Sequence, residues 1–294
     1  MEKTEDQIKQ HIDSFPVLPV TVARLLKVTG DPESSARDVM ETILPDQSLC
    51  LTVLKIANSV LFGRPKKVDS LALAVTVLGF NEVERIALTK AIVNSFSKLA
   101  ENHKQCIDKH WTHSFVCAMC AKVIARDLRI SPDTAFMGGL LHDIGKLVML
   151  ETFNDDYQVD NWMINFSSEE ILDNELEMFS FTHDQIGGQL LQQWFFPDDL
   201  VTAVAHHHQP TKAGEGECLA LIIQLSDILS FYCCNQEYLD DNDIVSAVQD
   251  SLPDLQARWH KVGLFLELGA IEGWYNWLAD NFEQGRKLKD AFTI

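Results

Sequence analysis

Helix start signals recur along this chain and constrain its fold more than any other feature. A cap residue followed three positions later by an acid or an amide occurs at Ser35–Asp38, Asn81–Glu84 and Thr182–Gln185. Ser131–Pro132 adds a fourth start, with proline at the first helical position, where its missing N–H breaks no hydrogen bond. Sustained alternation of apolar and polar residues, the mark of half-buried strands, does not recur. The chain is therefore predicted to be all-α.

Composition limits the classes of function. With 294 residues, 46% of them hydrophobic, the chain can bury a substantial core. Lys and Arg total 24 against 43 for Asp and Glu, which gives a formal net charge of -19. Because a phosphate backbone attracts positive charge, this balance disfavours general nucleic-acid binding.

Sequence features that direct a chain to membranes or to oxidising compartments are missing from the residues given. The segment MEKTEDQIKQHIDSF is polar and acidic, unlike a secretory signal, and no apolar run reaches the roughly 20 residues of a membrane span. The 7 cysteines are odd in number and lack framework spacing, which indicates reduced thiols. We predict a cytoplasmic protein without membrane contact.

A polar segment, AENHKQCID at residues 100–108, separates two apolar-periodic blocks. Ionisable residues are sparse in the helical block before this segment, whereas histidines gather after it. The sequence therefore predicts two helical subdomains, at residues 1–106 and 107–294.

The segment GGLLHDIGKLVML, residues 138–150, places ionisable side chains among apolar ones. We expect one buried helix from Ser131 to about Leu150, with its three glycines permitting close approach of another backbone or of a ligand. A buried Asp143 requires a partner, because an uncompensated carboxylate suffers a desolvation penalty of several kcal/mol. Lys146 follows Asp143 by three positions and His142 by four, so the three side chains would project to neighbouring sides.

Two explanations of this cluster compete. In the simpler one, Asp143 pairs with Lys146 while His142 donates to a backbone carbonyl. In the other, these residues bind metal, because further histidines and an aspartate lie in or beside other hydrophobic helices: His113, His183, His206, His207, His208 and Asp227. Imidazole and carboxylate groups from several helices converge readily on a divalent ion, which would also compensate the buried carboxylates.

The chain resembles the HD superfamily of metal-dependent phosphohydrolases, and more closely the HDOD group, HD-related output domains of bacterial signalling proteins. The segments that carry this resemblance are FPVLPVTVARLLKV (15–28), VLKIANSVLFG (53–63), VDSLALAVTVLG (68–79), WTHSFVCAMCAKVIA (111–125), GGLLHDIGKLVML (138–150), FTHDQIGGQLLQQWFFP (181–197), AVAHHHQP (203–210) and LSDILS (225–230). The resemblance implies a helical bundle of the HD-domain type preceded by a smaller N-terminal helical subdomain.

The resemblance also implies a ligand set. The positions that match a one-metal HD site are His113, His142, Asp143 and Asp227. His183, His207 and His208 match the histidines that HD-GYP phosphodiesterases use for a second metal, with Asp143 bridging. The expected cofactor is one or two divalent ions, with Fe or Mn favoured and Zn, Ni, Co and Mg as alternatives. Lys146 matches a lysine of phosphodiesterase relatives and would stabilise phosphate charge beside the catalytic Asp143.

Two departures narrow these implications. QPTKAGEGE, residues 209–217, stands where HD-GYP proteins carry their GYP segment, so hydrolysis of cyclic di-GMP is not implied. Lys109 stands one helical turn before His113, where some relatives have a ligating glutamate, so a third metal is not expected.

For several of these residues a structural role remains an alternative to metal binding. His183 lies at a helix start and would serve as a capping residue, and Asp227 would cap or pair with a lysine. Successive positions on a helix diverge by roughly 100°, so His206, His207 and His208 cannot all face one ion equally well. The resemblance places His207 and His208 in the site, which leaves His206 outside it. Cys117 and Cys120 are interpreted as core packing on an apolar helix.

Two functions follow from these features. The first is a metal-dependent phosphohydrolase acting on a phosphate ester or nucleotide. It is favoured because this chain retains the metal-binding positions that many HDOD relatives have lost. The second is a non-catalytic signal-transduction module, with a structural or sensory metal and a signalling protein as its partner.

Overall fold

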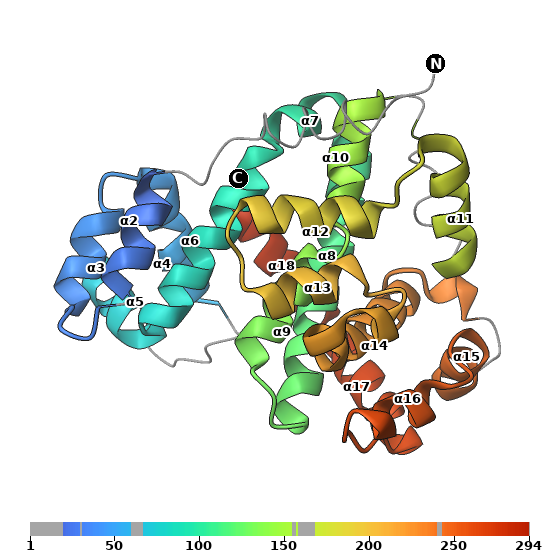
Figure 1. Cartoon of the computed structure of the whole chain (residues 1–294). Coiled ribbons are helices and arrows are strands. Elements are labelled where there is room, and N and C mark those ends of the chain that lie inside the picture. The colour runs from blue at the N-terminus through green and yellow to red at the C-terminus, as the bar shows by residue number, and fades with distance from the viewer. Residues whose placement is uncertain are drawn as a thin grey trace. The chain divides into compact units, whose positions relative to one another are not determined.

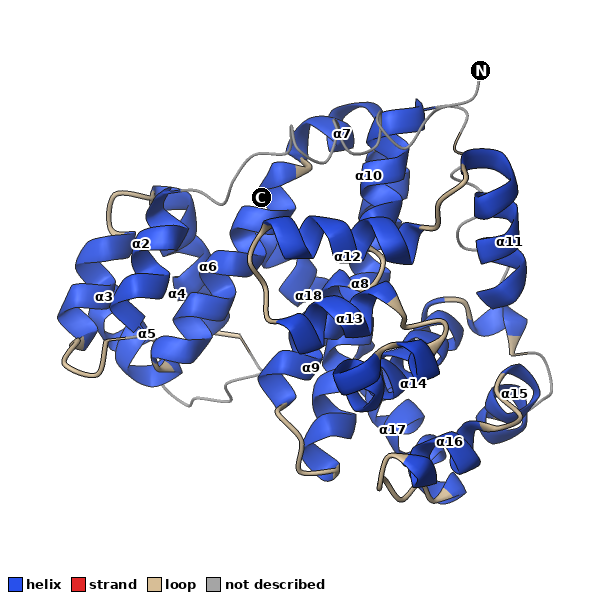
Figure 2. Ribbon diagram, viewed as in Figure 1, coloured by secondary structure: helices blue, strands red, loops and turns tan. Residues whose placement is uncertain are grey.

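A computed structural model describes residues 20–29, 31–59, 67–154, 157, 168–239 and 243–293. Every element in these ranges is helical and none is a strand, which confirms the all-α prediction (Figure 2). The N-terminal segment tested for a secretory signal lies outside them, as do residues 15–19 and 60–63 of the first two motifs.

The chain divides into two compact units. One contains the described residues between Phe15 and Asn102 together with those from Arg286 on. Its helices are α2 (Val20–Thr29), α3 (Ala36–Ile43), α4 (Gln47–Ala57), α5 (Leu71–Leu78), α6 (Phe80–Ser95) and α7 (Ser97–Asn102), with α2 to α6 in blue to cyan in Figure 1. Val39, Ile43, Val53 and Ile86 are fully buried between them, each contributing roughly 1.5–3 kcal/mol.

The second unit contains His103–Gly285. Its helices are α8 (Lys104–Asp127), α9 (Pro132–Leu141), α10 (Ile144–Phe153), α11 (Ser168–Phe179), α12 (His183–Gln193), α13 (Asp198–Ala205), α14 (Glu217–Cys234), α15 (Ile244–Ser251), α16 (Leu255–Lys261) and α17 (Leu268–Asp280), with short 3-10 turns η4 (Pro210–Lys212), η5 (Gly214–Gly216) and η6 (Gln236–Tyr238). The last helix, α18 (Phe282–Phe292), begins in this unit and ends in the other.

The end of α18 is tied to the first unit by hydrogen bonds. The Nζ of Lys90 donates to the carbonyl oxygen of Phe292 at 2.7 Å, and the hydroxyl of Thr52 donates to that of Ala291 at 3.3 Å. The boundary predicted at 106/107 differs from the observed division in two respects. Residues 104–106 already belong to α8, and the residues from Arg286 on belong to the first unit. Contacts between residues about 200 positions apart leave no local signal in the sequence.

Two apolar helices form much of the core of the second unit. Most of α8 from Trp111 onward is buried, and so is nearly all of α14. Gly214–Cys234 is the one described helix with the length and composition of a membrane span, and 72% of its apolar window is buried inside the protein. The seven cysteines all lie among the described residues and form no disulfide, and Cys117 and Cys120 are buried as predicted.

The predicted helix starts were correct in three of four cases. Ser35 and Asp38 form a complete capping box at α3, Ser131 accepts from the N–H of Thr134 at α9, and α12 begins at His183. The prediction of a cap at Asn81 was wrong, because α6 begins one residue earlier. Gly79, with φ +81°, turns the chain directly from α5 into α6 without a side-chain cap.

Candidate metal centre

The predicted single helix from Ser131 to Leu150 was wrong, and its interruption is the first element of the site. α9 ends at Leu141 and α10 begins at Ile144, with His142 and Asp143 in the turn between them. Adjacent side chains on a continuous helix diverge by roughly 100°. The turn instead lets the two face each other, with 3.4 Å between His142 Nε2 and Asp143 Oδ2.

Two glycines bring the flanking helices together. A Cβ on Gly145 would lie 1.8 Å from the carbonyl oxygen of His183, so α10 lies directly against the start of α12. A Cβ on Gly139 would lie 2.9 Å from the backbone of Ala118 in α8. These are the close backbone approaches expected from the sequence, whereas Gly138 faces the side chain of Ile223.

Four side chains form one potential ligand group, called here the four-residue group: Asp143, His183, His207 and His208. Their ligand atoms all lie within 4.8 Å of one another. Asp143 Oδ1 is 3.2 Å from His183 Nε2 and 3.8 Å from His207 Nε2, and the Nε2 atoms of His183 and His208 are 3.0 Å apart. His183 and His207 have no exposed surface.

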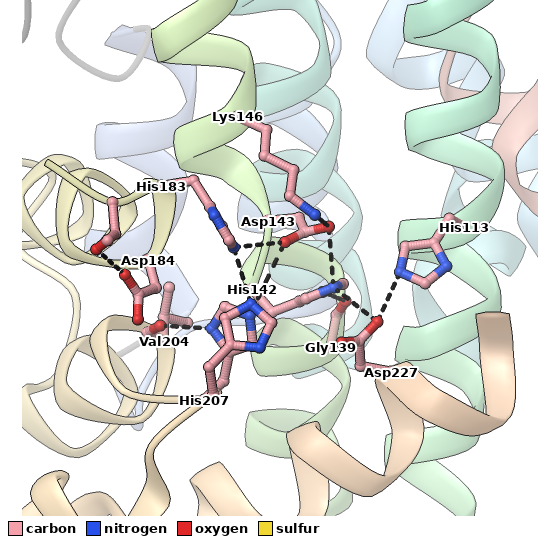
Figure 3. A network of polar contacts seen from close by, with 12 residues as sticks. His113, Gly139, His142, Asp143, Lys146, His183, Asp184, Val204, His207 and Asp227 are labelled. Atoms are coloured by element: carbon pink, nitrogen blue, oxygen red, sulfur yellow. Dashed lines mark hydrogen bonds and ion pairs between the residues drawn. The ribbon is translucent and has the colours of Figure 1, made fainter. Parts of the chain in front are cut away.

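Three further side chains form a second group, the three-residue group: His113, His142 and Asp227. Asp227 Oδ1 is 2.9 Å from His113 Nε2 and 3.5 Å from His142 Nε2. Figure 3 shows Asp143 between the rings of His183 and His142, with Asp227 and His113 beyond His142. The structure thus brings all seven predicted ligands together, from α8, α12, α14 and the turns after α9 and α13, and leaves metal binding by them a prediction.

The histidine rings are oriented through their Nδ1 atoms. His142 Nδ1 lies 2.9 Å from the carbonyl oxygen of Gly139, and His207 Nδ1 lies 2.8 Å from that of Val204. A carbonyl oxygen only accepts, so both Nδ1 atoms carry the proton. In the neutral rings, the Nε2 lone pairs are therefore the ones directed toward Asp143, which is the usual arrangement of metal-binding histidines.

Several polar atoms at the centre are buried without a hydrogen bond. Among the described residues, none forms a hydrogen bond with His142 Nε2, Asp143 Oδ1 or His207 Nε2. Each such atom costs about 1–3 kcal/mol when it is left unsatisfied. With the rings in their neutral form, all three atoms present lone pairs to the same space, so the residues present fit a divalent cation.

The contacts of the simpler explanation are present as well. Lys146 Nζ donates to Asp143 Oδ2 at 2.6 Å, while His142 donates to a backbone carbonyl as described above. This ion pair accounts for one oxygen of Asp143. It leaves Asp143 Oδ1 and the Nε2 atoms of His142 and His207 without a hydrogen bond, so the two explanations are compatible.

The pKa values of the buried histidines are set by two opposed effects, burial and the charge of neighbouring groups. Burial disfavours the imidazolium of His142, but the negative charge of Asp143 and further neighbouring groups together outweigh it and raise the pKa of His142 well above its usual value. Burial likewise opposes protonation of His183, but Glu175 and Asp143 together outweigh it and raise the pKa of His183 to about 9. Burial lowers the pKa of His207 to about 4. Protons on His142 and His183 thus supply positive charge that a divalent ion would also supply.

Sequence reasoning missed Glu175 on α11, which is 5% exposed. Its Oε2 accepts from both the backbone N–H of His183, at 2.7 Å, and the Nδ1 of that residue, at 2.8 Å. The available signal was periodicity, because Leu172, Glu175 and Phe179 lie on one buried face of α11. His110, which is not among the predicted ligands, is buried one turn before His113, and burial lowers its pKa to about 3.

The profile of the HDOD domain family matches residues 15–210. The chain belongs to the HDOD family. Among curated proteins, it is 22% identical over 219 residues to an uncharacterized protein of Treponema pallidum, covering 72% of this chain and 41% of that protein. It is 32% identical over 118 residues to ribonuclease Y of Thermus thermophilus, covering 40% of this chain and 16% of the enzyme. The HDOD chain therefore spans less than half the length of these relatives.

Solved structures share the fold. An HDOD domain protein of unknown function from Geobacter sulfurreducens superposes with a TM-score of 0.68 at 20% identity, covering 98% of this chain and 97% of that one. A protein from Shewanella amazonensis, provisionally named a phosphohydrolase, has a TM-score of 0.68 at 22% identity, with 97% and 98% covered. These likenesses establish the HD-type helical architecture.

Proposed function

We propose that this HDOD protein is a metal-dependent phosphohydrolase that acts on a phosphate ester or a nucleotide. The observation that carries the proposal is the set of buried lone pairs without hydrogen bonds at Asp143 Oδ1, His142 Nε2 and His207 Nε2. A carboxylate oxygen and two imidazole nitrogens would not be expected to gather there without a cation, because each is costly to bury unsatisfied.

The two ligand groups would hold one ion each, with Asp143 shared between them. Its Oδ1 faces His183 of the four-residue group, and its Oδ2 faces His142 of the three-residue group. Mixed imidazole and carboxylate ligation suits Fe or Mn and also admits Zn, Ni, Co and Mg. A divalent ion bound there would lower the pKa of a water molecule and so supply a nucleophile at neutral pH.

The protein's own side chains would bind and orient the phosphate. Lys146 is held beside the centre by Asp143, so its ammonium is placed to offset negative charge on a phosphate oxygen. The side chains of His113 and Asp227 are 11% and 13% exposed, whereas those of His142 and His183 are fully buried. A substrate would therefore approach from the side of His113 and Asp227.

The first test is the metal content of protein purified without chelator or a metal-binding tag. We expect about one to two equivalents in the wild type, with loss in His142→Ala and Asp143→Ala and retention in His206→Ala, a neighbouring histidine outside both groups. The same samples, reloaded with the ion found, are then assayed against phosphate monoesters, diesters and nucleotides. Turnover that persists undiminished in both ligand variants would refute the proposal.

A signalling module with a structural or sensory metal is the second candidate. The burial of His142, Asp143, His183 and His207 favours it, since a closed site suits a structural ion better than a catalytic one. In that case the same experiment gives bound metal, lost in the variants, without turnover of any phosphoester. The partner would then be a signalling protein.

A further inference from the structure

The carboxylate of Glu175 contacts His183 in two ways. It accepts from the backbone N–H of His183 and from the ring Nδ1, so one side chain fixes both the start of α12 and the plane of the imidazole. Tyr157 holds the carboxylate from the other side, its hydroxyl donating to Glu175 Oε1 at 2.7 Å. All three residues are at most 5% exposed.

The other ring anchors of the centre are neutral. His142 and His207 donate to backbone carbonyls, and His113 Nδ1 lies 3.3 Å from the hydroxyl oxygen of Ser230. That hydroxyl donates to the backbone carbonyl of Asp227 at 2.8 Å, so it accepts from the ring. A carboxylate anchor makes a shorter, charge-assisted bond and increases the donor strength of the opposite nitrogen. In His183 that nitrogen is Nε2, 3.2 Å from Asp143 Oδ1.

We propose that Glu175 is a positioning residue that orients the His183 ring and so determines whether the four-residue group takes up a metal ion, with Tyr157 holding the carboxylate. This inference rests on the proposed metal centre and adds a residue of α11 that contacts none of the ion-facing atoms. The three-residue group has its own anchors, so an ion there would be unaffected by changes at Glu175.

The test compares Glu175→Ala, Glu175→Gln and Tyr157→Phe with wild type. Glu177→Gln is the matched control, because it removes the same charge from an exposed position on the same helix. Calorimetric titration of Mn²⁺ into metal-free protein gives the number of ions bound and the affinity for each. Circular dichroism and thermal unfolding establish that each variant is folded.

We expect the alanine variant to retain one ion and to bind the second about 10–100-fold more weakly. Glutamine, which still accepts from Nδ1 but lacks the charge, should weaken the second ion about 10-fold. Tyr157→Phe should have a smaller effect, and Glu177→Gln none. If the alanine variant does not fold, the glutamine and phenylalanine variants carry the comparison.

A second readout separates orientation from general stability. In ¹⁵N-histidine spectra of the Zn²⁺-loaded protein, a ring proton bonded to a carboxylate gives a downfield Nδ1–H signal. This signal should be present in wild type and in Glu177→Gln and should be lost in Glu175→Ala. A residue that merely stabilised the fold would change the melting temperature and leave the signal in place.

The outcomes distinguish the two levels of the proposal. Two ions bound with wild-type affinity by both Glu175 variants would overturn the role of Glu175 and leave the metal centre intact. A folded wild-type protein that binds no ion would overturn the metal centre itself, and with it any control of ion uptake by Glu175.

Discussion

The two ligand groups differ in how deeply they lie and in how they are held. In the four-residue group, His183 and His207 are fully buried, and their rings are fixed by a carboxylate and a backbone carbonyl. In the three-residue group, the side chains of His113 and Asp227 are partly exposed, and the anchor of His113 is a hydroxyl. His208 is the one partly exposed member of the four-residue group, whereas in the three-residue group only His142 is fully buried. The three-residue group therefore has more of the access that a substrate would need.

Asp143 is the one residue on which both groups depend. Its two oxygens face different groups, and Oδ2 also accepts from Lys146. Substitution of Asp143 should therefore affect ion binding by both groups, whereas substitution of any other ligand should affect one group only.

The largest effect is expected for Asp143→Asn. Both ions should be lost, and the free energy of unfolding should fall by about 3–5 kcal/mol, because the Lys146 ammonium would be left buried without its counter-charge. Urea denaturation and metal analysis measure the two effects. The double variant Asp143→Asn, Lys146→Met should recover much of the stability and none of the metal. If the single variant were as stable as wild type, the ion pair would contribute little.

For Gly145→Ala, the free energy of unfolding should fall by about 3 kcal/mol, since the added methyl group would overlap the backbone carbonyl of His183. A backbone atom, unlike the end of a side chain, cannot rotate away. The four-residue group should lose its ion, because α10 and α12 must separate. Gly273→Ala is the control: it is exposed on a helix with nothing within 4 Å of its Cβ position, so it should gain up to about 1 kcal/mol. Equal unfolding midpoints in urea for the two variants would contradict the close approach.

Single-ligand variants should affect one group at a time. His207→Gln should weaken the ion of the four-residue group by more than about 100-fold, beyond the 10–100-fold typical of outer partners, and Asp227→Asn should do the same to the other ion. Calorimetric titration of Mn²⁺ should then show one remaining tight site in each variant. Loss of both ions in either variant would mean that the groups bind cooperatively.

The smallest expected effect concerns pH. Glu175 and Asp143 together raise the pKa of His183 to about 9, so the ring carries a proton at pH 7 that an ion must displace. Ion affinity of the four-residue group should therefore rise about tenfold per pH unit between pH 6 and 8. The metal-free protein should show the opposite trend. Its Glu175–His183 pair stabilises the fold fully below pH 6.5, and this contribution is lost as pH rises through about 9.

Titrations at several pH values and denaturation of chelated protein measure these opposed trends. His207, whose pKa is lowered to about 4, stays neutral throughout this range and should not contribute. An affinity that did not vary with pH would show that His183 is already neutral in the metal-free protein.

The sequence by itself determined the helical class, the family and most helix starts. Ser35 and Ser131 cap the helices they were predicted to cap, because capping depends on a few neighbouring residues. The residue types of the ligand set were also readable, because histidines and aspartates inside apolar segments need a reason to be buried.

Only the tertiary structure decided the break at His142 and Asp143, the attachment of Glu175 to His183 and the return of α18 to the first unit. Local propensity and spacing are properties of neighbouring residues, and the apolar run 138–150 is compatible with one unbroken helix. The break is set instead by packing, because the turn brings Asp143 against the start of α12, where the missing side chain of Gly145 lets the two backbones meet.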